Sequence, residues 1–238
     1  MLRCSVRVFN TPHLAAAAAG DAFIDGVSEF SKRLAGLAAG LTMKPVYDHI
    51  VSAEFRSSGL FSETAFVQLD EVVSPVWGGA SFTEEIDSHL LSRLSGGYRT
   101  FLTIDGQATQ LDLEATRHRA AILENGGLGV QLLGIGVNGH VGFNEPGCHP
   151  ESHCRHTALA DSTLERNGYQ PGTRAITLGI ADIMSAQKII IVATSTAKSP
   201  AVKAMIEGPK SIDCPASLLR EHPNMDLFLD RDAAKDLS

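Results

Sequence analysis

Short apolar runs recur along the chain with helical patterns between most of them, and this alternation restricts the fold more than any other feature. Several of the runs are apolar throughout, as expected for parallel strands that helices cover on both faces. The clearest helical patterns span residues 81–94 and 113–127; Asp112 precedes the second, and Gly126 and Gly127 close it. The expected strands are residues 5–9, 33–39, 65–69, 100–104, 130–136, 188–194 and 226–230. The alternation predicts an α/β fold with one doubly wound, mainly parallel, Rossmann-like sheet and helices on both faces.

We assign residues 1–238 to a single domain, because no repeat, low-complexity tract or Pro/Ser-rich linker divides the chain. The formal net charge is −7 at pH 7, so the chain has no basic surplus with which to bind a nucleic acid. A small anionic ligand remains compatible with this charge, since about two or three local cations are enough to hold one phosphate.

The N-terminal segment and the cysteines indicate a cytoplasmic protein. The alanine run at residues 15–19 follows Thr11 and Pro12, which start a helix, and Asp21 comes soon after it, so we expect an amphipathic helix rather than a secretion signal. No apolar run approaches the length needed to span a membrane. The cysteines show neither a CxxC pair nor a dense disulfide framework, which is typical of reduced thiols: Cys4, Cys148, Cys154 and Cys214.

Polar segments follow four of the expected strands. In open parallel sheets, ligands bind beyond the carboxyl ends of the strands. This rule selects residues 40–42, 70–71, 134–145 and 194–198 as candidates for the functional site.

The stretch LLGIGVNGHVGFNEPG, residues 132–147, carries the strongest chemical signal. Gly134 and Gly136 have no side chain, so a ligand can approach the backbone there. His140 and Glu145 follow on the loop, where Glu145 can fix the tautomer of the imidazole and raise its basicity. The alternative is a structural loop whose His and Glu are polar surface; the glycines and the buried strand before them favour a catalytic pair.

Two acidic residues, Asp70 and Glu71, come directly after an apolar run. A carboxylate at this position can remove a carbon-bound proton next to a carbonyl group, provided that burial raises its pKa toward neutrality. Equally, the pair can be acidic residues at a helix N-terminus, stabilised by the helix dipole. The motif alone does not choose between these interpretations.

Two further segments suit a phosphate group. Gly40 and Thr42 occupy a strand-to-helix turn, where backbone N–H groups and a hydroxyl can hold an anion, although a Walker A ending is missing. Lys198 provides a flexible cation after another strand. The alternatives are a plain turn and a solvated lysine.

The loop CHPESHCRH, residues 148–156, contains two cysteines and three histidines and raises the question of a metal. Its spacing fits no standard structural zinc pattern, so we predict no metal site and a polar loop next to the functional site.

Taken together, the chain resembles the glucosamine-6-phosphate deaminase / 6-phosphogluconolactonase superfamily over essentially its whole length. The segment LGIGVNGHVGFNEPG is similar to the deaminase signature of Gly-x-Gly-x-(Asp/Asn)-Gly-His followed by Asn-Glu-Pro, and the lactonases usually lack the Asn-Glu-Pro. Further similar segments follow in the family's order: GLT (40–42), LDE (69–71), ITLGIADIMSA (176–186) and AKSPAVKAMIEG (197–208). The resemblance implies a fold of the deaminase/lactonase type.

Within this superfamily, Asn138 stands where glucosamine 6-phosphate deaminases usually carry Asp. Asn138, TRAITLG (173–179) and CPASLL (214–219) are similar to the galactosamine-6-phosphate deaminase/isomerase branch. The resemblance therefore implies aldose-to-ketose isomerisation of galactosamine 6-phosphate with release of ammonia, giving tagatose 6-phosphate. The alternatives are a glucosamine-6-phosphate deaminase, a 6-phosphogluconolactonase and a non-catalytic sugar-phosphate-binding regulator.

The resemblance also implies residue roles. His140, oriented by Glu145, opens the sugar ring; Asp70 takes the C2 proton; Asn138 replaces a second acid beside the histidine. The resemblance implies no metal or organic cofactor and leaves a homo-oligomer possible. The basic residues of the glucosamine enzyme's allosteric site would fall in the loop at residues 148–157 and are not recognisable here, so we predict no activation by an acetylamino-sugar phosphate. The predicted substrate-binding residues are Gly40, Thr42, Glu71, Gly134, Gly136, Arg174 and Lys198, with Arg166 as a second candidate for the phosphate-binding arginine.

The loop at residues 40–43 departs from the family pattern GSTP. Leu41 removes a hydroxyl and Met43 removes a proline, whereas Thr42 is kept. These departures weaken the transfer of the family's phosphate-binding role to this loop.

Overall fold

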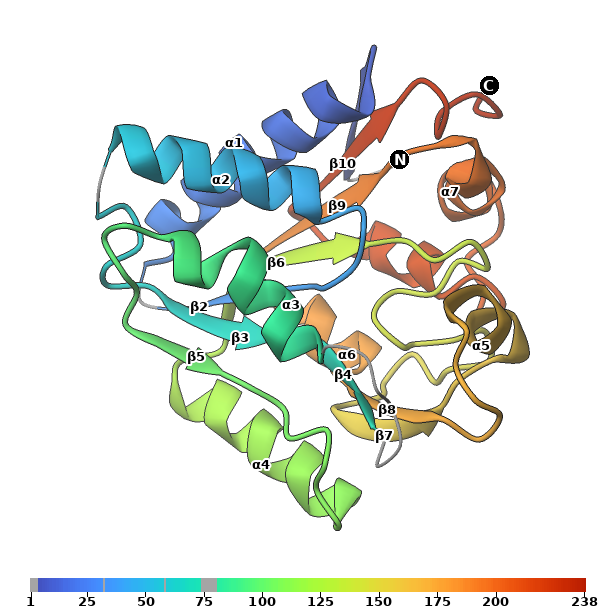
Figure 1. Cartoon of the computed structure of the whole chain (residues 1–238). Helices are drawn as coiled ribbons and strands as arrows, with labels where there is room; N and C mark the ends of the chain where they lie inside the picture. The colour runs from blue at the N-terminus through green and yellow to red at the C-terminus, as the bar shows by residue number, and fades with distance from the viewer. Residues whose placement is uncertain (1–3, 32, 58, 74–80) are drawn as a thin grey trace.

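The computed structural model describes residues 4–31, 33–57, 59–73 and 81–238 (Figure 1). The strands in these ranges are β1 (Cys4–Phe9), β2 (Leu34–Leu37), β3 (Ala65–Gln68), β4 (Asp70–Val73), β5 (Thr100–Leu102), β6 (Leu128–Gly134), β7 (Arg155–Ala158), β8 (Arg174–Thr177), β9 (Lys188–Ala193) and β10 (Met225–Asp230). The α-helices are α1 (Pro12–Glu29), α2 (Lys44–Arg56), α3 (Phe82–His89), α4 (Leu111–Glu124), α5 (Asp161–Asn167), α6 (Ile180–Met184) and α7 (Ser199–Ile206). Short 3-10 helices are η1 (Leu91–Arg93), η2 (Thr196–Lys198) and η3 (Pro215–Glu221).

Seven strands form a parallel sheet in the order β1-β10-β9-β6-β2-β3-β5. Each of the apolar runs expected to be a strand supplies one of them, so the predicted α/β fold with a mainly parallel sheet is confirmed. From β2 the chain adds β3 and β5 on one side, and from β6 it adds β9 and β10 on the other. The order therefore reverses between β2 and β6, as in a doubly wound sheet.

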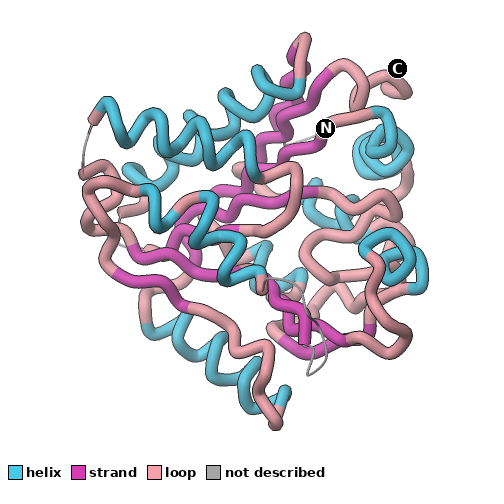
Figure 2. The backbone as a smooth tube through the Cα atoms, viewed as in Figure 1, coloured by secondary structure: helices cyan, strands magenta, loops and turns pink. Residues whose placement is uncertain are grey.

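Helices cover both faces of this sheet. Figures 1 and 2 show α1 and α2 on one side of it and α4 and α6 on the other. The central strand β9 is shielded from both sides, and the side chains from Ile189 to Val192 are fully buried. Apolar burial of this kind drives folding, and it explains why these strands are apolar throughout. Among the described residues, no helix is both long and apolar enough to cross a membrane.

A second sheet, small and antiparallel, has the order β4-β8-β7. Leu69 joins it to the large sheet, because its N–H donates to the carbonyl of Leu37 in β2 and its own carbonyl accepts from the N–H of Leu178, both at 2.9 Å. The apolar pattern did not predict this sheet. Its strands have four residues each, and residues 155–156, the end of the expected loop, form the first half of β7 instead.

The predicted helix ends are partly correct. Helix α1 begins at Thr11 and Pro12 as expected, and the Thr11 side chain accepts the N–H of Leu14 at 3.2 Å. Helix α4 begins at Leu111, so Asp112 lies in its first turn rather than before it; a carboxylate there is still favourable to the helix dipole. Gly127 has φ 80° and closes the helix by donating to the carbonyl of Ile122 at 2.9 Å.

Candidate active site

A cavity of about 390 Å³ lies at the carboxyl ends of β2, β3, β6 and β9. It is next to the boundary between β2 and β6 where the strand order reverses, which is the place where doubly wound sheets bind ligands. The sequence-selected residues that line it are Gly40, Thr42, Asp70, Gly134, Gly136, His140 and Lys198. Within the described part of the chain, four selected residues do not line it: Glu71, Asn138, Glu145 and Arg174.

Asp70 brings a carboxyl group to the cavity from the start of β4. The residue is only 6% exposed. Burial, together with the smaller effect of the negative charges of Glu71 and Glu85, raises the pKa of Asp70 to about 8. A carboxyl group with this pKa can act as a base near neutral pH.

Glu71 points away from the cavity and stabilises the start of α3. Its carboxylate accepts the backbone N–H groups of Phe82 and Thr83 at 3.0 and 3.1 Å, and the side-chain amide of Gln68 at 2.8 Å. These are the N–H groups that a helix leaves without internal partners. The substrate contact predicted for Glu71 is therefore replaced by a structural role, although the helix concerned begins eleven residues later.

His140 is held on a glycine-rich turn. The N–H of Gly136 donates to the carbonyl of His140 at 2.8 Å, and Gly139 has φ 84°. A Cβ atom on Gly136 would lie 2.3 to 2.5 Å from the imidazole ring. Gly136 therefore makes room for the His140 ring, whereas the sequence analysis assigned that space to a ligand. Gly142 lies next to Asp70 in the same way, with its missing Cβ 3.4 Å from Oδ2 of that residue.

Glu145 and Asn138 lie behind the imidazole. Oε2 of Glu145 is 3.3 Å from Nδ1 of His140 and accepts the Asn138 amide at 2.8 Å. The Asn138 carbonyl oxygen accepts the backbone N–H of His140 at 3.2 Å. Burial raises the pKa of Glu145, but the hydrogen bond and charge of His140, together with two further side-chain hydrogen bonds, outweigh it and the pKa is lowered. An ionised Glu145 thus faces Nδ1 and leaves Nε2 for a ligand.

Two cations, Lys198 and Arg166, line the cavity. Lys198 donates from Nζ to the carbonyl of Ile135, and burial followed by the charge of Arg166 lowers the pKa of Lys198 to about 8. Arg174 is exposed and donates to His156 at 2.6 Å. It lies at the end of β8 remote from Thr177, the residue paired with Asp70, and it does not line the cavity, whereas Arg166, the second candidate for the phosphate-binding arginine, does.

The turn between β2 and α2 forms another wall. Gly40 has φ 108°, which favours glycine, and its N–H donates to Oε1 of Glu85 at 2.9 Å. The Gly40 N–H is therefore already bound to a carboxylate. Thr42 lines the cavity, and Leu41, at its mouth, is 80% exposed.

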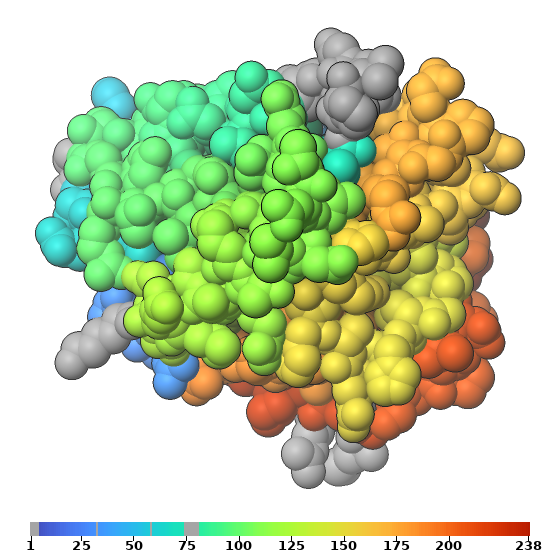
Figure 3. All heavy atoms as spheres, turned by 90° about the horizontal axis from the view of Figure 1, so that it is seen from below, coloured from blue at the N-terminus to red at the C-terminus, as the bar shows by residue number. Residues whose placement is uncertain are grey.

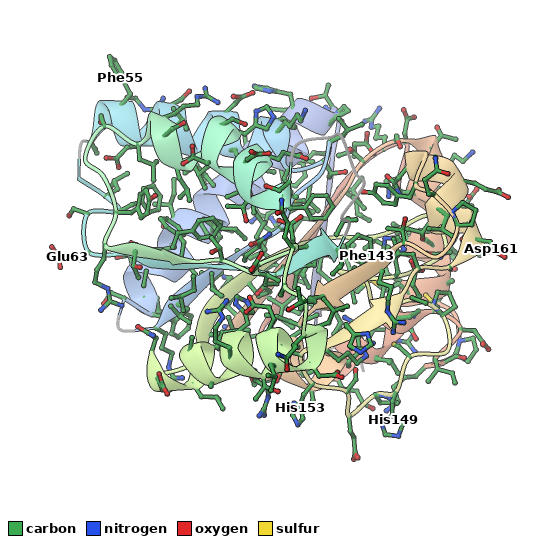
Figure 4. The ribbon with its side chains drawn as sticks, turned by 60° about the horizontal axis from the view of Figure 1, so that its bottom comes forward. Phe55, Glu63, Phe143, His149, His153 and Asp161 are labelled. Atoms are coloured by element: carbon green, nitrogen blue, oxygen red, sulfur yellow. The ribbon has the colours of Figure 1, made fainter. Side chains whose placement is uncertain are left out.

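The sequence analysis gave no role to several lining residues, although Phe143, Thr194 and Ser195 fall within the segments that it selected. Phe82 and Phe143 stack with ring centroids 5.9 Å apart and planes at 15°, and Phe143 lies in the interior of the molecule (Figure 4). Tyr169, Thr194 and Ser195 also line the cavity. These side chains come from separate loops and helix ends, where no periodic pattern marks them.

The loop at residues 148–156 lies at the outer surface. His149 and His153 are at the outer edge of the molecule (Figure 4), and His153 is 2.9 Å from Asp182. Arg155 donates to the Asn144 side chain at 2.9 Å and so connects β7 to the loop that carries His140. Seen from below, α4 and this part of the chain form one continuous surface (Figure 3). The described residues contain no group of three or more His, Cys, Asp or Glu arranged to hold a metal ion.

Comparison with known protein families identifies the family of this chain. The model of the family described as glucosamine-6-phosphate isomerases/6-phosphogluconolactonase matches residues 13–228. The chain belongs to this family. Members of this family with 6-phosphogluconolactonase activity share the fold: the enzyme from Trypanosoma brucei has a TM-score of 0.78 at 21% identity over 100% of both chains.

The relatives with higher identity are named as deaminases. The glucosamine-6-phosphate deaminase of Lactobacillus delbrueckii subsp. bulgaricus is 36% identical over 222 residues, 90% of this chain and 91% of the relative. Glucosamine-6-phosphate deaminase 1 of Giardia intestinalis is 34% identical over 209 residues, 84% of this chain and 78% of the relative. A solved monomeric glucosamine-6-phosphate deaminase has a TM-score of 0.88 at 28% identity, over 97% of this chain and 99% of its own. These family members favour the glucosamine branch over the galactosamine branch expected from the sequence.

Proposed function

We propose that the protein is an amino-sugar-phosphate deaminase/isomerase that converts glucosamine 6-phosphate into fructose 6-phosphate and ammonia. The observation that carries this proposal is one cavity lined by Asp70, by His140 and by the cations Arg166 and Lys198. The cations suit the phosphate, while a carboxyl group and an imidazole suit proton transfer at the sugar.

The charges of the cavity suit an amino sugar phosphate in particular. Asp70 has Glu71 and Glu85 close enough to raise its pKa, so one end of the site is acidic. Arg166 and Lys198 also line the cavity and lie close enough for the charge of one to lower the pKa of the other, so together they form a basic end. A substrate with an ammonium group on one carbon and a phosphate on another complements both ends, whereas a lactone phosphate complements only one.

The chemistry proceeds by four proton transfers and a hydrolysis. His140, with Glu145 on Nδ1, moves a proton from the hydroxyl on C1 to the ring oxygen, and the ring opens to an aldehyde. Asp70 then takes the proton from C2 while a proton of the substrate's ammonium group passes to the aldehyde oxygen, which gives a neutral enolamine. Asp70 returns its proton to C1, which gives a protonated imine at C2. Addition of water to C2 releases ammonia and leaves the ketose.

Asn138 is the feature that favoured galactosamine 6-phosphate. Its amide bonds Glu145 and the backbone of His140, and the residue does not line the cavity, so we expect no contact with the carbon at which the two epimers differ. We therefore expect ammonia release from glucosamine 6-phosphate to exceed that from galactosamine 6-phosphate. Preference for the galacto epimer would restore the sequence-based substrate, and hydrolysis of 6-phosphogluconolactone without ammonia release from either sugar would contradict the proposal.

The rate should have a narrow optimum near pH 8. The base Asp70 must be ionised, and its pKa is raised to about 8, so kcat/KM rises as the pH increases toward that value. Lys198 must be protonated to hold phosphate, and its pKa is lowered to about 8, so kcat/KM falls above it. Between pH 6 and 7, kcat/KM, corrected for ionisation of the substrate, should increase about tenfold. A flat profile over this interval would remove Asp70 as the base.

Arg166 and Arg174 form a matched pair for testing the phosphate end. Arg166→Ala removes a cation from the cavity and should raise KM about tenfold or more, the cost of a charge-assisted hydrogen bond. Arg174→Ala removes the same side chain from an exposed site next to His156 and should change KM by less than about twofold. Steady-state kinetics decides, and a larger effect at Arg174 would restore the sequence-based choice.

A further inference from the structure

The turn after β9 contains an unusual backbone conformation. Ser195 has φ 81° and ψ 151°. In the described part of the chain it is the single non-glycine residue with positive φ. This region of φ/ψ space is almost exclusive to glycine, so a serine there is strained. Such strain persists only where the surrounding structure enforces it, and it is concentrated at functional sites.

The group that enforces it is the carboxylate of Asp230. The backbone N–H of Ser195 is 3.1 Å from both carboxylate oxygens. Asp230 ends β10, which runs parallel beside β9, and the residue is 1% exposed. Its Oδ1 also accepts the N–H of Ala233 at 2.8 Å. The C-terminal turn therefore fixes the carboxylate, and the carboxylate in turn fixes the Ser195 peptide.

The strained turn leads directly to the basic end of the cavity. Ser195 and Lys198 both line the cavity, and the backbone N–H of Lys198 donates to the carbonyl of Ser195 at 3.1 Å. The Lys198 side chain in turn donates to the carbonyl of Ile135. The orientation of the Ser195 peptide thus affects both the position of the Lys198 backbone and the direction of the Lys198 side chain.

We propose that Asp230 is a positioning residue for phosphate binding, which holds Ser195 in its left-handed conformation and thereby directs Lys198 into the cavity. The proposal rests on the proposed function, because it takes the phosphate of the sugar as the ligand of this end. Asp230 itself does not line the cavity. Its charge opposes that of a phosphate, so its effect on binding comes from geometry and not from attraction.

Because Asp230 and phosphate are both negative, an effect of charge and an effect of positioning change phosphate affinity in opposite directions. If only charge mattered, Asp230→Asn would bind inorganic phosphate more tightly. If Asp230 positions the turn, the variant should bind it at least about fivefold more weakly in titration calorimetry. Asp226→Asn is the matched control, because it removes the same charge from the other end of β10, where Asp226 pairs with Lys188 at 3.0 Å. Phosphate binding by Asp230→Asn that is unchanged or tighter would overturn the proposal.

Variants of the exposed Ser195 test the same idea if Asp230→Asn does not fold. Ser195→Ala and Ser195→Val both remove the hydroxyl, but a β-branched side chain opposes positive φ more strongly. We expect Ser195→Val to bind phosphate about fivefold more weakly than Ser195→Ala. Equal dissociation constants would show that the backbone conformation is irrelevant to binding.

A rescue experiment separates positioning from general stability. Glycine adopts φ 81° without strain, so Ser195→Gly added to Asp230→Asn should recover most of the lost phosphate affinity. In the single Asp230→Asn variant, KM should rise while kcat stays within about threefold, because Asp70 and His140 are untouched. A lowered unfolding midpoint with normal KM would mean a merely structural role. The calorimetry requires no turnover, so failure of ammonia release by the unaltered protein would count against the proposed function alone.

Discussion

Asp70→Asn should reduce ammonia release from glucosamine 6-phosphate by about 10²- to 10⁴-fold, the range expected for loss of a general base. The amide keeps the size of the side chain but cannot accept the C2 proton. Binding of the substrate should change little, because the carboxyl group acts only on the reacting carbon. The measurement is kcat and KM by ammonia release; retention of even about a tenth of the rate would show that another group is the base.

Asp70→Asn should increase the stability of the fold although it reduces activity. The pKa of Asp70 is raised in the folded protein to about 8, so folding is favoured while the group is protonated. The stability that it contributes is fully present below its unfolded pKa and is lost as the pH rises through about 8. A neutral asparagine avoids this loss. At pH 8 or above, Asp70→Asn should therefore have a higher urea midpoint than the unaltered protein, which would exclude misfolding as the cause of its inactivity.

His140→Gln should lower turnover of the cyclic substrate by about 10²-fold or more, because no side chain remains to move the proton that opens the ring. Its effect on an analogue without the C5 hydroxyl, which cannot close the six-membered ring, should be much smaller. Parallel assays of both compounds give the comparison. An equal loss on both would remove His140 from ring opening.

Glu145→Gln provides the companion variant for His140. It keeps the shape of the side chain and the hydrogen bond from Asn138, but it removes the charge next to Nδ1 of His140. It should impair the cyclic substrate in the same direction as His140→Gln and to a smaller extent, since the imidazole itself is still present. An effect of Glu145→Gln confined to the open-chain analogue would contradict its role as the partner of the imidazole.

Much of the large sheet could be predicted, because burial on both faces leaves a signal that a single chain displays. Strand β9 is apolar from Ile189 to Ala193 for the same reason that it is buried. The small sheet leaves no such signal. Strand β4 follows β3 after a single residue, and β7 is half exposed, so neither stands out as a separate apolar run.

The site residues that the sequence identified follow strands of the large sheet. His140 and Asp70 were found because each follows a buried strand of the large sheet. Arg174 was preferred for its position next to a strand, but that strand belongs to the small sheet and carries the arginine away from the cavity. Arg166 lies near the end of α5, and only the packing of that helix brings it to the site. Glu71 was assigned to substrate binding and not to α3, because the helix that it stabilises begins eleven residues later.

The peptide groups of Leu69 bond to both sheets, so the number of residues between the two sheets is fixed at this point. Successive residues of a strand face opposite ways, and here one acid faces the cavity and the next faces α3. Insertion of one residue after Leu69 would turn Asp70 toward α3 and leave the inserted residue at the cavity, whereas deletion of one residue before Asp70 would place Glu71 at the cavity. The register of this junction, more than the identity of either acid, therefore decides which carboxyl group reaches the cavity and which one stabilises the helix.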